Sequence, residues 1–563
     1  MNCRWRIHGG PSKVTTMTCR ILSLLLILET GTAIAADATA FAGSWNIGEP
    51  DPPGGRPFVM TLNSDFTAKK SHIPRATGKW EVVNDAARVV WSDGWRDIIR
   101  REGDAFRKIA YAPGSGFDDK PDNTAFAQKL KEPETSQLKI GWGRADITPE
   151  GPVGLIGFGR RRISEGAKDP ITATVLALEG VDKEGEVVEQ AILISCDLIS
   201  LRRVTMDAVR ARLKERLPDF DPDRLIMNAT HTHQAPQQQS GSSRGIYDLK
   251  ENERPPGWMT GDEYRSFMAE RIAVAAENAW KGRKPGGVSW GIDHAVVGFN
   301  RRIVLSDGEA LMSRNTNRPN FEQIEGIEDH TLSLLFFFDD KAKLTGMIVN
   351  VASPAQAEQG GNQISADFWH DLREEIAGRH GPDVAVLPQC AAAGEGMPIT
   401  GIQQRAQTVM AERRGISWRR EIARRIADGV DRTLPVSRKH IDDRLTFNHT
   451  VARISLPEKD PPSRPFVVLD PVDSVELHLL RIGDVGMATV PFELYIDYGM
   501  RIQARSKALM TFTVQLSCGH SEYLPSMRAT EGGGYSAEKY LVGPRGGSAL
   551  VEECLQRINA FWP

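Results

Sequence analysis

The sequence predicts a mixed α+β or α/β domain, with sheets flanked by helices, preceded by a small antiparallel β domain of lipocalin-like appearance. Short strand-like segments separated by turns fill residues 41–111. From residue 138 onward, apolar strand-like runs alternate with amphipathic helical segments. At 563 residues the chain is also long for one domain, so two folded units are expected.

The N-terminus has the features of a secretory signal. Arg20 precedes an apolar run at residues 21–28, and residues 33–35 read Ala-Ile-Ala, the small-x-small form of a signal peptidase site. We therefore expect residues 1–35 to be removed and the mature protein to be exported, to the periplasm or the medium. No later run approaches the roughly 18 apolar residues of a membrane helix, so no transmembrane segment is expected.

The rest of the chain is expected to divide into a small all-β domain at 36–114, a linker at 115–137 and a larger domain at 138–563. The linker is assigned because that stretch is polar and contains proline. Four tryptophans of the β domain are expected to pack in its core rather than to line a ligand pocket: Trp45, Trp80, Trp91 and Trp95. In the larger domain helices are predicted at 204–217, 261–279, 364–377, 403–434 and 548–561.

Composition limits the partners. The formal net charge of −3 argues against nucleic acid or an anionic membrane as the main partner, so a small-molecule, lipid or glycan substrate is expected. The oligomeric state is left open. Four cysteines remain after the signal, too few for a disulfide framework, and no two have zinc-ligand spacing: Cys196, Cys390, Cys518 and Cys554.

A histidine pair, His231 and His233, follows the short apolar run at 225–227. Residues i and i+2 of an extended segment point the same way, so both rings can face one pocket. Such a pair can hold a metal, or one ring can bind metal while the other relays a proton. The alternative is a pair of hydrogen-bonded histidines at a strand end.

Further segments in the same order make the pattern more specific. They are Gly-Arg-Ala-Asp-Ile-Thr-Pro at 143–149, Asp197, Ala-Thr-His-Thr-His at 229–233, Asn-Arg-Arg at 300–302, Ile-Ser-Ala-Asp at 364–367 and Val-Pro-Phe-Glu at 490–493. This ordered set resembles the catalytic domain of the neutral, non-lysosomal ceramidases over residues 138–563.

The resemblance implies a zinc-dependent amidase. It makes His231 the first zinc ligand, Glu493 the glutamate ligand and Tyr523 the tyrosine ligand. His233 is implied to position or stabilise the reacting oxygen.

Two positions depart from the family's pattern. Ser353 stands where the family has its second zinc histidine, and Met397 stands where it has its proposed nucleophilic serine. A hydroxyl is a poor zinc ligand and a thioether is not a useful nucleophile. The expected N-terminal β domain is also foreign to the family, so the family's lipid substrate is not carried over to this chain.

Zinc chemistry survives these changes, because a metal can lower the pKa of a water molecule to about 7. Glu395 and Asp367 are candidate bases. His370, three residues after Asp367 on the same helix face, is a candidate replacement ligand. The structural alternatives are that Asp367 caps a helix, that Glu395 is a surface turn residue, and that His370 packs under Trp369.

Three functions follow from these residues. The leading one is an exported zinc-dependent hydrolase that cleaves an amide or related bond. The second is a non-catalytic binding or accessory protein on a ceramidase-like scaffold. The third is a hydrolase of glycosidic bonds, with Asp367 and Glu395 as the acid and base.

Overall fold

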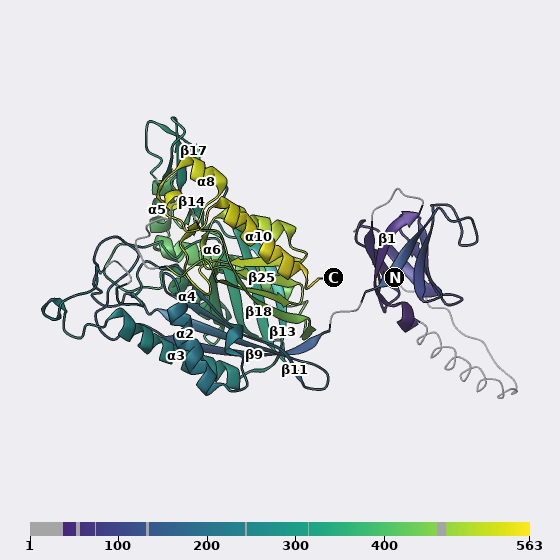
Figure 1. Ribbon diagram of the computed structural model, residues 1–563, viewed down its shortest axis with the longest axis horizontal. Helices are drawn as coiled ribbons and strands as arrows, with labels where there is room; N and C mark the ends of the chain where they lie inside the picture. Colours follow the sequence, from purple (N-terminus) through teal and green to yellow (C-terminus); the bar gives the residue numbers. More distant parts are fainter. Residues whose placement is uncertain are drawn as a thin grey trace, which may run out of the picture. The chain divides into compact units, whose positions relative to one another are not determined.

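The computed structural model describes residues 38–51, 57–73, 75–130, 134–241, 245–313, 315–458 and 469–562. The chain divides into two units, Met1–Pro133 and Glu134–Pro563 (Figure 1). The expected signal at 1–35 lies outside the described residues. Within the described ranges, no helix has the length and apolar character needed to cross a membrane.

The first unit is a closed antiparallel barrel in which each strand pairs with the next and the last pairs with the first. Inward positions carry the buried aromatic residues Trp45, Trp80 and Trp91, whereas Trp95 lines a cavity of about 390 Å³. The predicted antiparallel β domain is therefore present. Its strands are β1 (Gly43–Asp51), β2 (Phe58–Leu62), β3 (Thr67–Lys70), β4 (Thr77–Val82), β5 (Ala86–Trp91), β6 (Arg96–Glu102), β7 (Ala105–Tyr111) and β8 (Asn123–Lys129).

The predicted linker at 115–137 is corrected by strand β8. This strand pairs with both β7 and β1 and so closes the barrel. The side chains that it buries there are the small Ala125 and Ala127. Two alanines among polar residues give a weak apolar alternation, which explains why the strand was not expected from the sequence.

The second unit is built on a nine-stranded sheet with the order β12-β11-β10-β9-β13-β18-β19-β20, and β22 pairs with β9. Antiparallel pairs form its middle, whereas β11 and β12 are parallel, as are β19 and β20. The strands are β9 (Ser136–Asp146), β10 (Thr172–Val181), β11 (Val187–Cys196), β12 (Leu225–Ala229), β13 (Lys284–His294), β18 (Thr331–Asp339), β19 (Leu344–Val351), β20 (Ala385–Cys390) and β22 (Arg444–Leu445).

This sheet curls so that its two halves face each other, because β20 packs against β10 and β11. Alternate residues of β18 therefore enter different cores. Leu335 and Phe337 join the core between the halves, whereas Phe336 joins the core under the helices. Helix α3 (Gly261–Lys281), with α2 (Arg203–Arg216) against it, packs on β9 and β10; α6 (Trp418–Ser437), with α4 (Phe368–His380) against it, packs on β13 and β18.

The helices lie close to their predicted positions, with one difference. The capping box at Thr260 and Glu263 starts α3 as expected. The predicted helix at 403–434 is two helices, α5 (Gln404–Arg413) and α6. Gly415 adopts a φ of +71°, and the Ser417 hydroxyl accepts the Arg420 N–H to cap α6.

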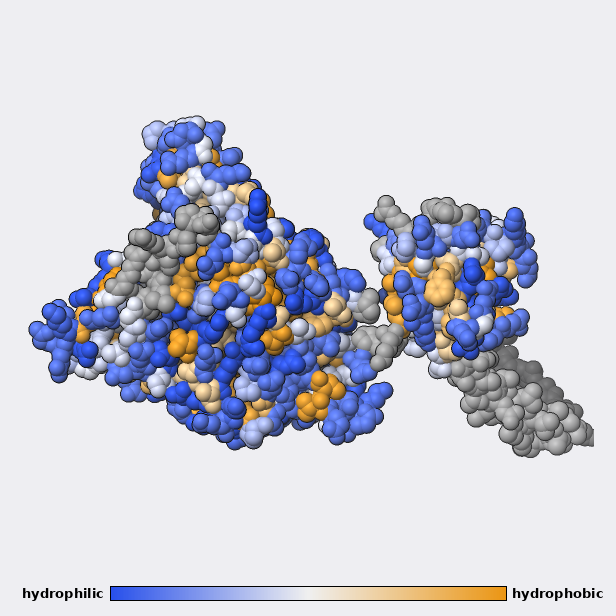
Figure 2. All heavy atoms as spheres, viewed as in Figure 1, coloured by the Kyte–Doolittle hydropathy of each residue, from blue (hydrophilic) through white to orange (hydrophobic). Residues whose placement is uncertain are grey.

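A four-stranded sheet completes the second unit in the order β23-β24-β25-β27, with α10 (Pro544–Asn559) packed on β24 and β25. On the face drawn in Figure 2, this unit is mainly hydrophilic, with apolar side chains in smaller groups. The remaining elements are β14 (Phe299–Asn300), β15 (Arg302–Leu305), β16 (Ala310–Met312), β17 (Phe321–Ile324), β21 (Gly396–Met397), β23 (Phe447–Ile454), β24 (Val475–Ile482), β25 (Val485–Thr489), β26 (Glu493–Leu494), α7 (Ile496–Arg505), β27 (Met510–Val514), β28 (Tyr523–Leu524), α8 (Met527–Gly532), α9 (Tyr535–Glu538), η1 (Pro222–Arg224) and η2 (Glu251–Glu253).

Candidate metal centre

The candidate centre begins where buried strand β12 ends. His231 has a φ of +66°, a left-handed conformation that is rare for a residue with a side chain. The backbone N–H groups of His231 and Thr232 both donate to the carbonyl of Leu198, which holds the turn. The two histidine rings lie 5.1 Å apart at 85°, so they are neighbours through this turn rather than through an extended strand.

The hydrogen bonds of His231 determine its tautomer. Its Nδ1 lies 2.6 Å from the carbonyl oxygen of Ile199. Because a carbonyl only accepts, Nδ1 carries a proton, and in the neutral ring the lone pair is on Nε2. That Nε2 lies 3.3 Å from Oε2 of Glu493. This is the arrangement typical of a metal-binding histidine, with one nitrogen fixed by the backbone and the other available.

Glu493 lies on β26, directly beside Tyr523 of the parallel strand β28. Burial alone would raise the pKa of Glu493, but His231, His520 and Arg301 outweigh burial and lower it to about 2. The carboxylate is therefore ionised at neutral pH. A carboxylate oxygen and an imidazole lone pair repel each other unless a cation, either a proton or a metal ion, lies between them.

His520 is a further residue of this cluster that the sequence reasoning did not single out. Its side chain is buried, and its Nε2 has no hydrogen-bond partner among the described residues. Burial lowers its pKa to about 4, against an opposing effect of Glu493, so the ring is neutral at neutral pH. A lone histidine in an irregular loop has no helix or strand period that would indicate its direction.

Tyr523 and Arg301 are two further neighbours of Glu493. The Tyr523 hydroxyl is 2.7 Å from that of Tyr535, and burial raises the Tyr523 pKa well above 10. Arg301 interacts electrostatically with Glu493 and both tyrosines, and its buried Nε has no hydrogen-bond partner within the part of the chain that the structure describes. Arg301 belongs to the Asn-Arg-Arg segment, which was part of the family pattern without an assigned role.

His233 presents one unpaired nitrogen. Its Nε2 lies 2.9 Å from the side-chain nitrogen of Gln356, which can only donate. Nδ1 then carries the proton, and it is buried without an acceptor among the described residues. Burial, followed by His231, lowers the pKa of His233 well below 6.5, so the ring is neutral. Gly157 fits beside it because a Cβ there would lie 2.8 Å from Nδ1.

Ser353 and Met397, the two residues that depart from the family pattern, are both buried and make contacts within the fold. The Ser353 hydroxyl is buried and donates to the carbonyl of Val297 at 2.9 Å. Met397 is buried on β21, paired with Phe299. The small-residue turn before it packs against the metal-ligand candidate, because a Cβ on Gly394 would lie 2.5 Å from the carbonyl oxygen of Glu493.

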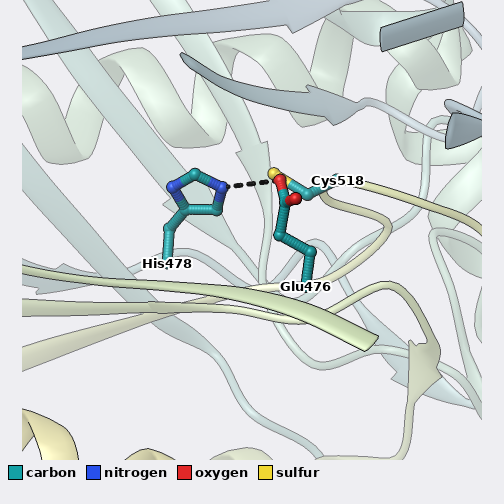
Figure 3. Close-up of side chains that lie close together, drawn as sticks. All are labelled: Glu476, His478 and Cys518. Atoms are coloured by element: carbon teal, nitrogen blue, oxygen red, sulfur yellow. Dashed lines mark hydrogen bonds and ion pairs between the residues drawn. The ribbon is translucent and has the colours of Figure 1, made fainter. Parts of the chain in front are cut away.

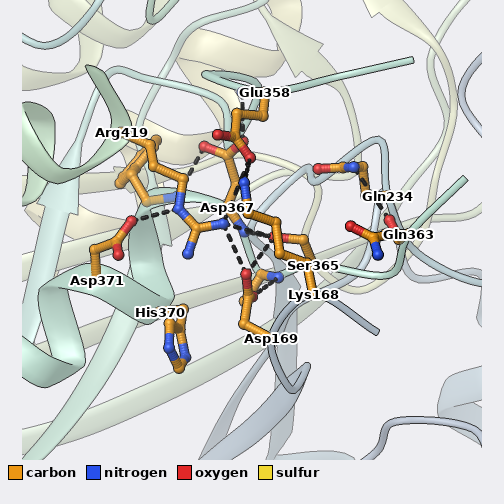
Figure 4. A network of polar contacts seen from close by, with 12 residues as sticks. Lys168, Asp169, Gln234, Glu358, Gln363, Ser365, Asp367, His370, Asp371 and Arg419 are labelled. Carbon is orange, nitrogen blue, oxygen red and sulfur yellow. Dashed lines mark hydrogen bonds and ion pairs between the residues drawn. The ribbon is translucent and has the colours of Figure 1, made fainter. Parts of the chain in front are cut away.

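Asp367, predicted as a catalytic base, is held in a structural role. Its carboxylate accepts the backbone N–H groups of Ala357, Glu358 and Phe368 at 3.0, 2.7 and 2.8 Å. Its own φ is +57°, and burial raises its pKa to about 6. Figure 4 shows the neighbouring network around Arg419. Asp367 therefore caps α4 and anchors the loop before it.

Glu395, the other predicted base, is directed at a helix start instead of the His231–Glu493 pair. Both of its carboxyl oxygens lie 3.1 Å from the N–H of Ile496, the first residue of α7. It is buried, so the alternative of a surface turn residue is wrong, and burial raises its pKa to about 8. Glu395 and Asp367 are thus held at the starts of different helices, which does not support their pairing as a glycosidase acid and base.

His370, predicted to replace the missing ligand, lies on the outer part of α4. Its Nε2 is 3.4 Å from the carboxylate of Glu374, one helical turn later, and the side chain is 24% exposed. It takes no part in the contacts drawn around Asp367 in Figure 4. His370 thus pairs with Glu374 at the surface of α4, whereas His520 interacts with Glu493, so His520 is the better candidate.

His231 and Glu493 place two zinc-ligand atoms 3.3 Å apart, and His520 is a third candidate donor. His231 offers Nε2, Glu493 offers a carboxylate, and His520 offers an unpaired buried Nε2. Imidazole nitrogens with one carboxylate are a common zinc ligand set. Of the predicted ligands, His231 and Glu493 contact each other. Tyr523 is the strand partner of Glu493, but its hydroxyl contacts that of Tyr535, and His520 interacts electrostatically with the pair.

Over three quarters of its length the chain has the fold of the neutral ceramidases. It is similar to the crystal structure of neutral ceramidase from Pseudomonas aeruginosa, with a TM-score of 0.56 and 15% identity, covering 76% of this chain and 74% of that chain. A ceramidase complexed with C2 gives the same TM-score and identity, covering 76% and 75%. No protein-family model matches the chain. No curated protein sequence matches it either. At this identity the likeness establishes the fold.

Proposed function

We propose that the chain is an exported zinc-dependent hydrolase that cleaves an amide or a related bond with activated water. The observation that carries the proposal is the distance of 3.3 Å between the ionised Glu493 carboxylate and Nε2 of His231, whose Nδ1 is held by the Ile199 carbonyl. The buried, unpaired ring of His520 interacts electrostatically with both, which supports His520 as a third donor.

When bound, zinc supplies Lewis acidity and lowers the pKa of a water molecule to about 7. The protein residues have separate roles. His231, Glu493 and His520 would hold the ion, and the bond from His231 Nδ1 to the Ile199 carbonyl fixes the ring orientation. Tyr523 lies on the strand next to Glu493 and supports that side of the centre.

His233 and Arg301 act on the substrate. The unpaired Nδ1–H of His233 donates to the carbonyl oxygen of the scissile bond, where negative charge develops in the transition state. Arg301 adds fixed positive charge beside Glu493. Because the pKa of His233 lies well below 6.5, its role at neutral pH is that of a neutral donor.

Water is the nucleophile in this proposal because none of the candidate side chains offers an alternative. Met397 occupies the family's serine position, and the Ser353 hydroxyl donates to Val297. Cys390 is buried, and burial raises its thiol pKa to about 12. A thiol with so high a pKa is a poor nucleophile.

The test is amine release from a panel of N-acyl amides with short and long acyl chains, using the zinc-loaded full chain. We expect hydrolysis that Glu493→Ala abolishes and His370→Ala retains. Zinc-loaded protein that binds the amides without cleaving them would instead support the non-catalytic binding protein. A matched panel of glycosides tests the third function. N-terminal sequencing of exported protein tests cleavage after Ala35, with a start at Ala36 expected.

A further inference from the structure

A second cluster of metal-ligating side chains lies in the same unit as the candidate centre and shares no residue with it. Glu476 and His478 are two residues apart on β24, and Cys518 lies in the loop after β27. One ligand atom of each lies within 4.8 Å of those of the other two, and all three side chains are buried. Figure 3 shows the imidazole of His478 and the sulfur of Cys518 at the Glu476 carboxylate.

A chain of hydrogen bonds determines which nitrogen of His478 faces this cluster. His449 Nδ1 lies 3.1 Å from the Gln190 carbonyl and must donate to it. With its proton on Nδ1, the His449 ring presents the lone pair of Nε2 to His478. That lone pair accepts Nδ1–H of His478 at 2.8 Å. The remaining Nε2 of His478 then faces the Glu476 carboxylate at 3.0 Å.

In the metal-free protein a proton on His478 Nε2 bridges to the Glu476 carboxylate at 3.0 Å, and the ligand atoms of Glu476, His478 and Cys518 lie close enough together for one metal ion to take the place of that proton. We propose that Glu476, His478 and Cys518 bind one zinc ion. A carboxylate, an imidazole and a thiolate are zinc ligands, and the soft thiolate disfavours magnesium and calcium. The Gln190–His449–His478 chain supplies the outer hydrogen bonds that orient a ligating histidine.

The charge of the cluster allows a zinc ion to replace two protons. Without metal, one proton lies on His478 Nε2 and one on the Cys518 thiol; binding releases both protons and admits one doubly charged ion, so the total charge does not change. Arg210 and Arg453 also contact the Glu476 carboxylate, at 2.5 and 3.0 Å, and keep these partners. No oxidant or reductant is needed.

The proposed zinc site joins the loop that contains Cys518, which has strained backbone conformations, to strand β24. Leu516, Cys518 and Glu522 have φ values of +50°, +59° and +66°, which residues with side chains rarely adopt. The N–H of Cys518 donates to the Met227 carbonyl on β12, the strand that leads to His231. A zinc ion bridging β24 to Cys518 is therefore structural, because it holds the loop that carries His520 two residues later.

X-ray absorption at the zinc edge distinguishes this site from the candidate centre. The full chain is purified with zinc. A sulfur neighbour at about 2.3 Å is expected, because the His231–Glu493 centre contains only nitrogen and oxygen donors. Cys518→Ser and His478→Ala should each remove the sulfur signal and lower the zinc content by one equivalent. Cys554→Ser, at a buried cysteine of α10, is the matched control and should retain both.

Loss of zinc from one of the two metal sites should leave the other site occupied. His231→Ala should remove one equivalent of zinc and leave the sulfur signal, so loss of the proposed hydrolase would not affect this proposal. If Cys518→Ser does not fold, wild-type protein alone decides the question. Wild-type protein whose zinc has only nitrogen and oxygen neighbours, or that holds no zinc after loading and dialysis, would show that a proton occupies the cluster and would overturn the proposal.

Discussion

Nε2 of His231 faces Oε2 of Glu493 at 3.3 Å, although the two residues come from different sheets. His231 follows β12 at one end of the large sheet, and Glu493 follows β25 of the four-stranded sheet. The N–H of Ala229 donates to the Leu516 carbonyl, and a bridge joins Asn228 to Ser517, so the two sheets meet at this point. The candidate centre therefore depends on the packing of the second unit as a whole.

His231 and Glu493 should both bind the metal ion directly. Alanine at His231 or at Glu493 removes one donor from a small ligand set. We expect either change to lower the zinc content by one equivalent and to weaken zinc binding by more than the roughly 10–100-fold typical of an outer partner. Zinc content by mass spectrometry and competition with a chelator measure both. His370→Ala is the control, and loss of zinc from that variant would restore His370 as a ligand.

His520 should be the third donor. Replacing it by alanine removes the imidazole nitrogen that this loop offers to Glu493, so zinc affinity should fall by at least about tenfold. His440→Ala, at an exposed histidine, is the matched control. Equal zinc affinity in the His520→Ala variant and the wild type would exclude His520 from the centre.

Glu395 should make the stability of the protein depend on pH. Its pKa is about 8 in the folded chain, against 4.5 for an ordinary glutamate, so between these values the folded state holds a proton that the unfolded state has released. The free energy of unfolding contributed by this group is therefore fully present below about pH 4.5 and is lost as the pH rises to about 8.

Glu395→Gln removes this dependence, because glutamine cannot ionise and still accepts the Ile496 N–H. We expect the variant to gain Tm relative to the wild type at about pH 8.5 and to gain little at about pH 5, measured on metal-free protein. A variant that is destabilised equally at both pH values would mean that Glu395 is ionised in the fold.

Asp367 should contribute to stability and not to metal binding. Alanine at this position leaves three backbone N–H groups without their acceptor, and each unsatisfied buried group costs about 1–3 kcal/mol. We expect the free energy of unfolding to fall by about 3 kcal/mol or more, and by less in Asp367→Asn, which keeps one acceptor oxygen. Denaturant unfolding measures this. If the Asp367→Ala variant kept its stability but lost zinc, Asp367 would belong to the metal centre.

Cys390 should be inert. Its thiol is buried beside Gln515, and its raised pKa leaves almost no thiolate at neutral pH. Iodoacetamide should leave Cys390 unmodified in the folded protein, and Cys390→Ala should retain hydrolysis. Mass spectrometry of the treated protein reads the first result, and a covalent acyl adduct at this cysteine would contradict the proposed water mechanism.

The regular helices and strands of the fold were predictable because the spacing of apolar and capping residues that indicates them extends over only a few neighbouring residues. The face of α2, the capping box of α3 and the apolar strands of the large sheet all follow from spacing within a few residues. Strand β8 was missed because its inward positions are alanines, and the break before α6 was missed because Gly415 and Ser417 lie within a highly charged run.

The candidate site was predictable only in part. His231, Glu493 and Tyr523 came from the order of segments along the chain, and the structure brings them together. Asp367, Glu395 and His370 were chosen by chemical type, and the direction of a side chain depends on tertiary contacts that no short pattern contains. Glu395, for example, turns to the start of α7 because the Ile496 N–H lies there.

The most direct test of the metal centre is an anomalous difference map, collected at the zinc edge, from crystals of the full chain grown with zinc. We predict a peak between His231 Nε2 and the Glu493 carboxylate, within about 2.0–2.2 Å of both, with His520 Nε2 turned toward it. A second peak at Cys518 tests the other site separately. A map from zinc-loaded crystals with no peak between His231 and Glu493 would contradict the account.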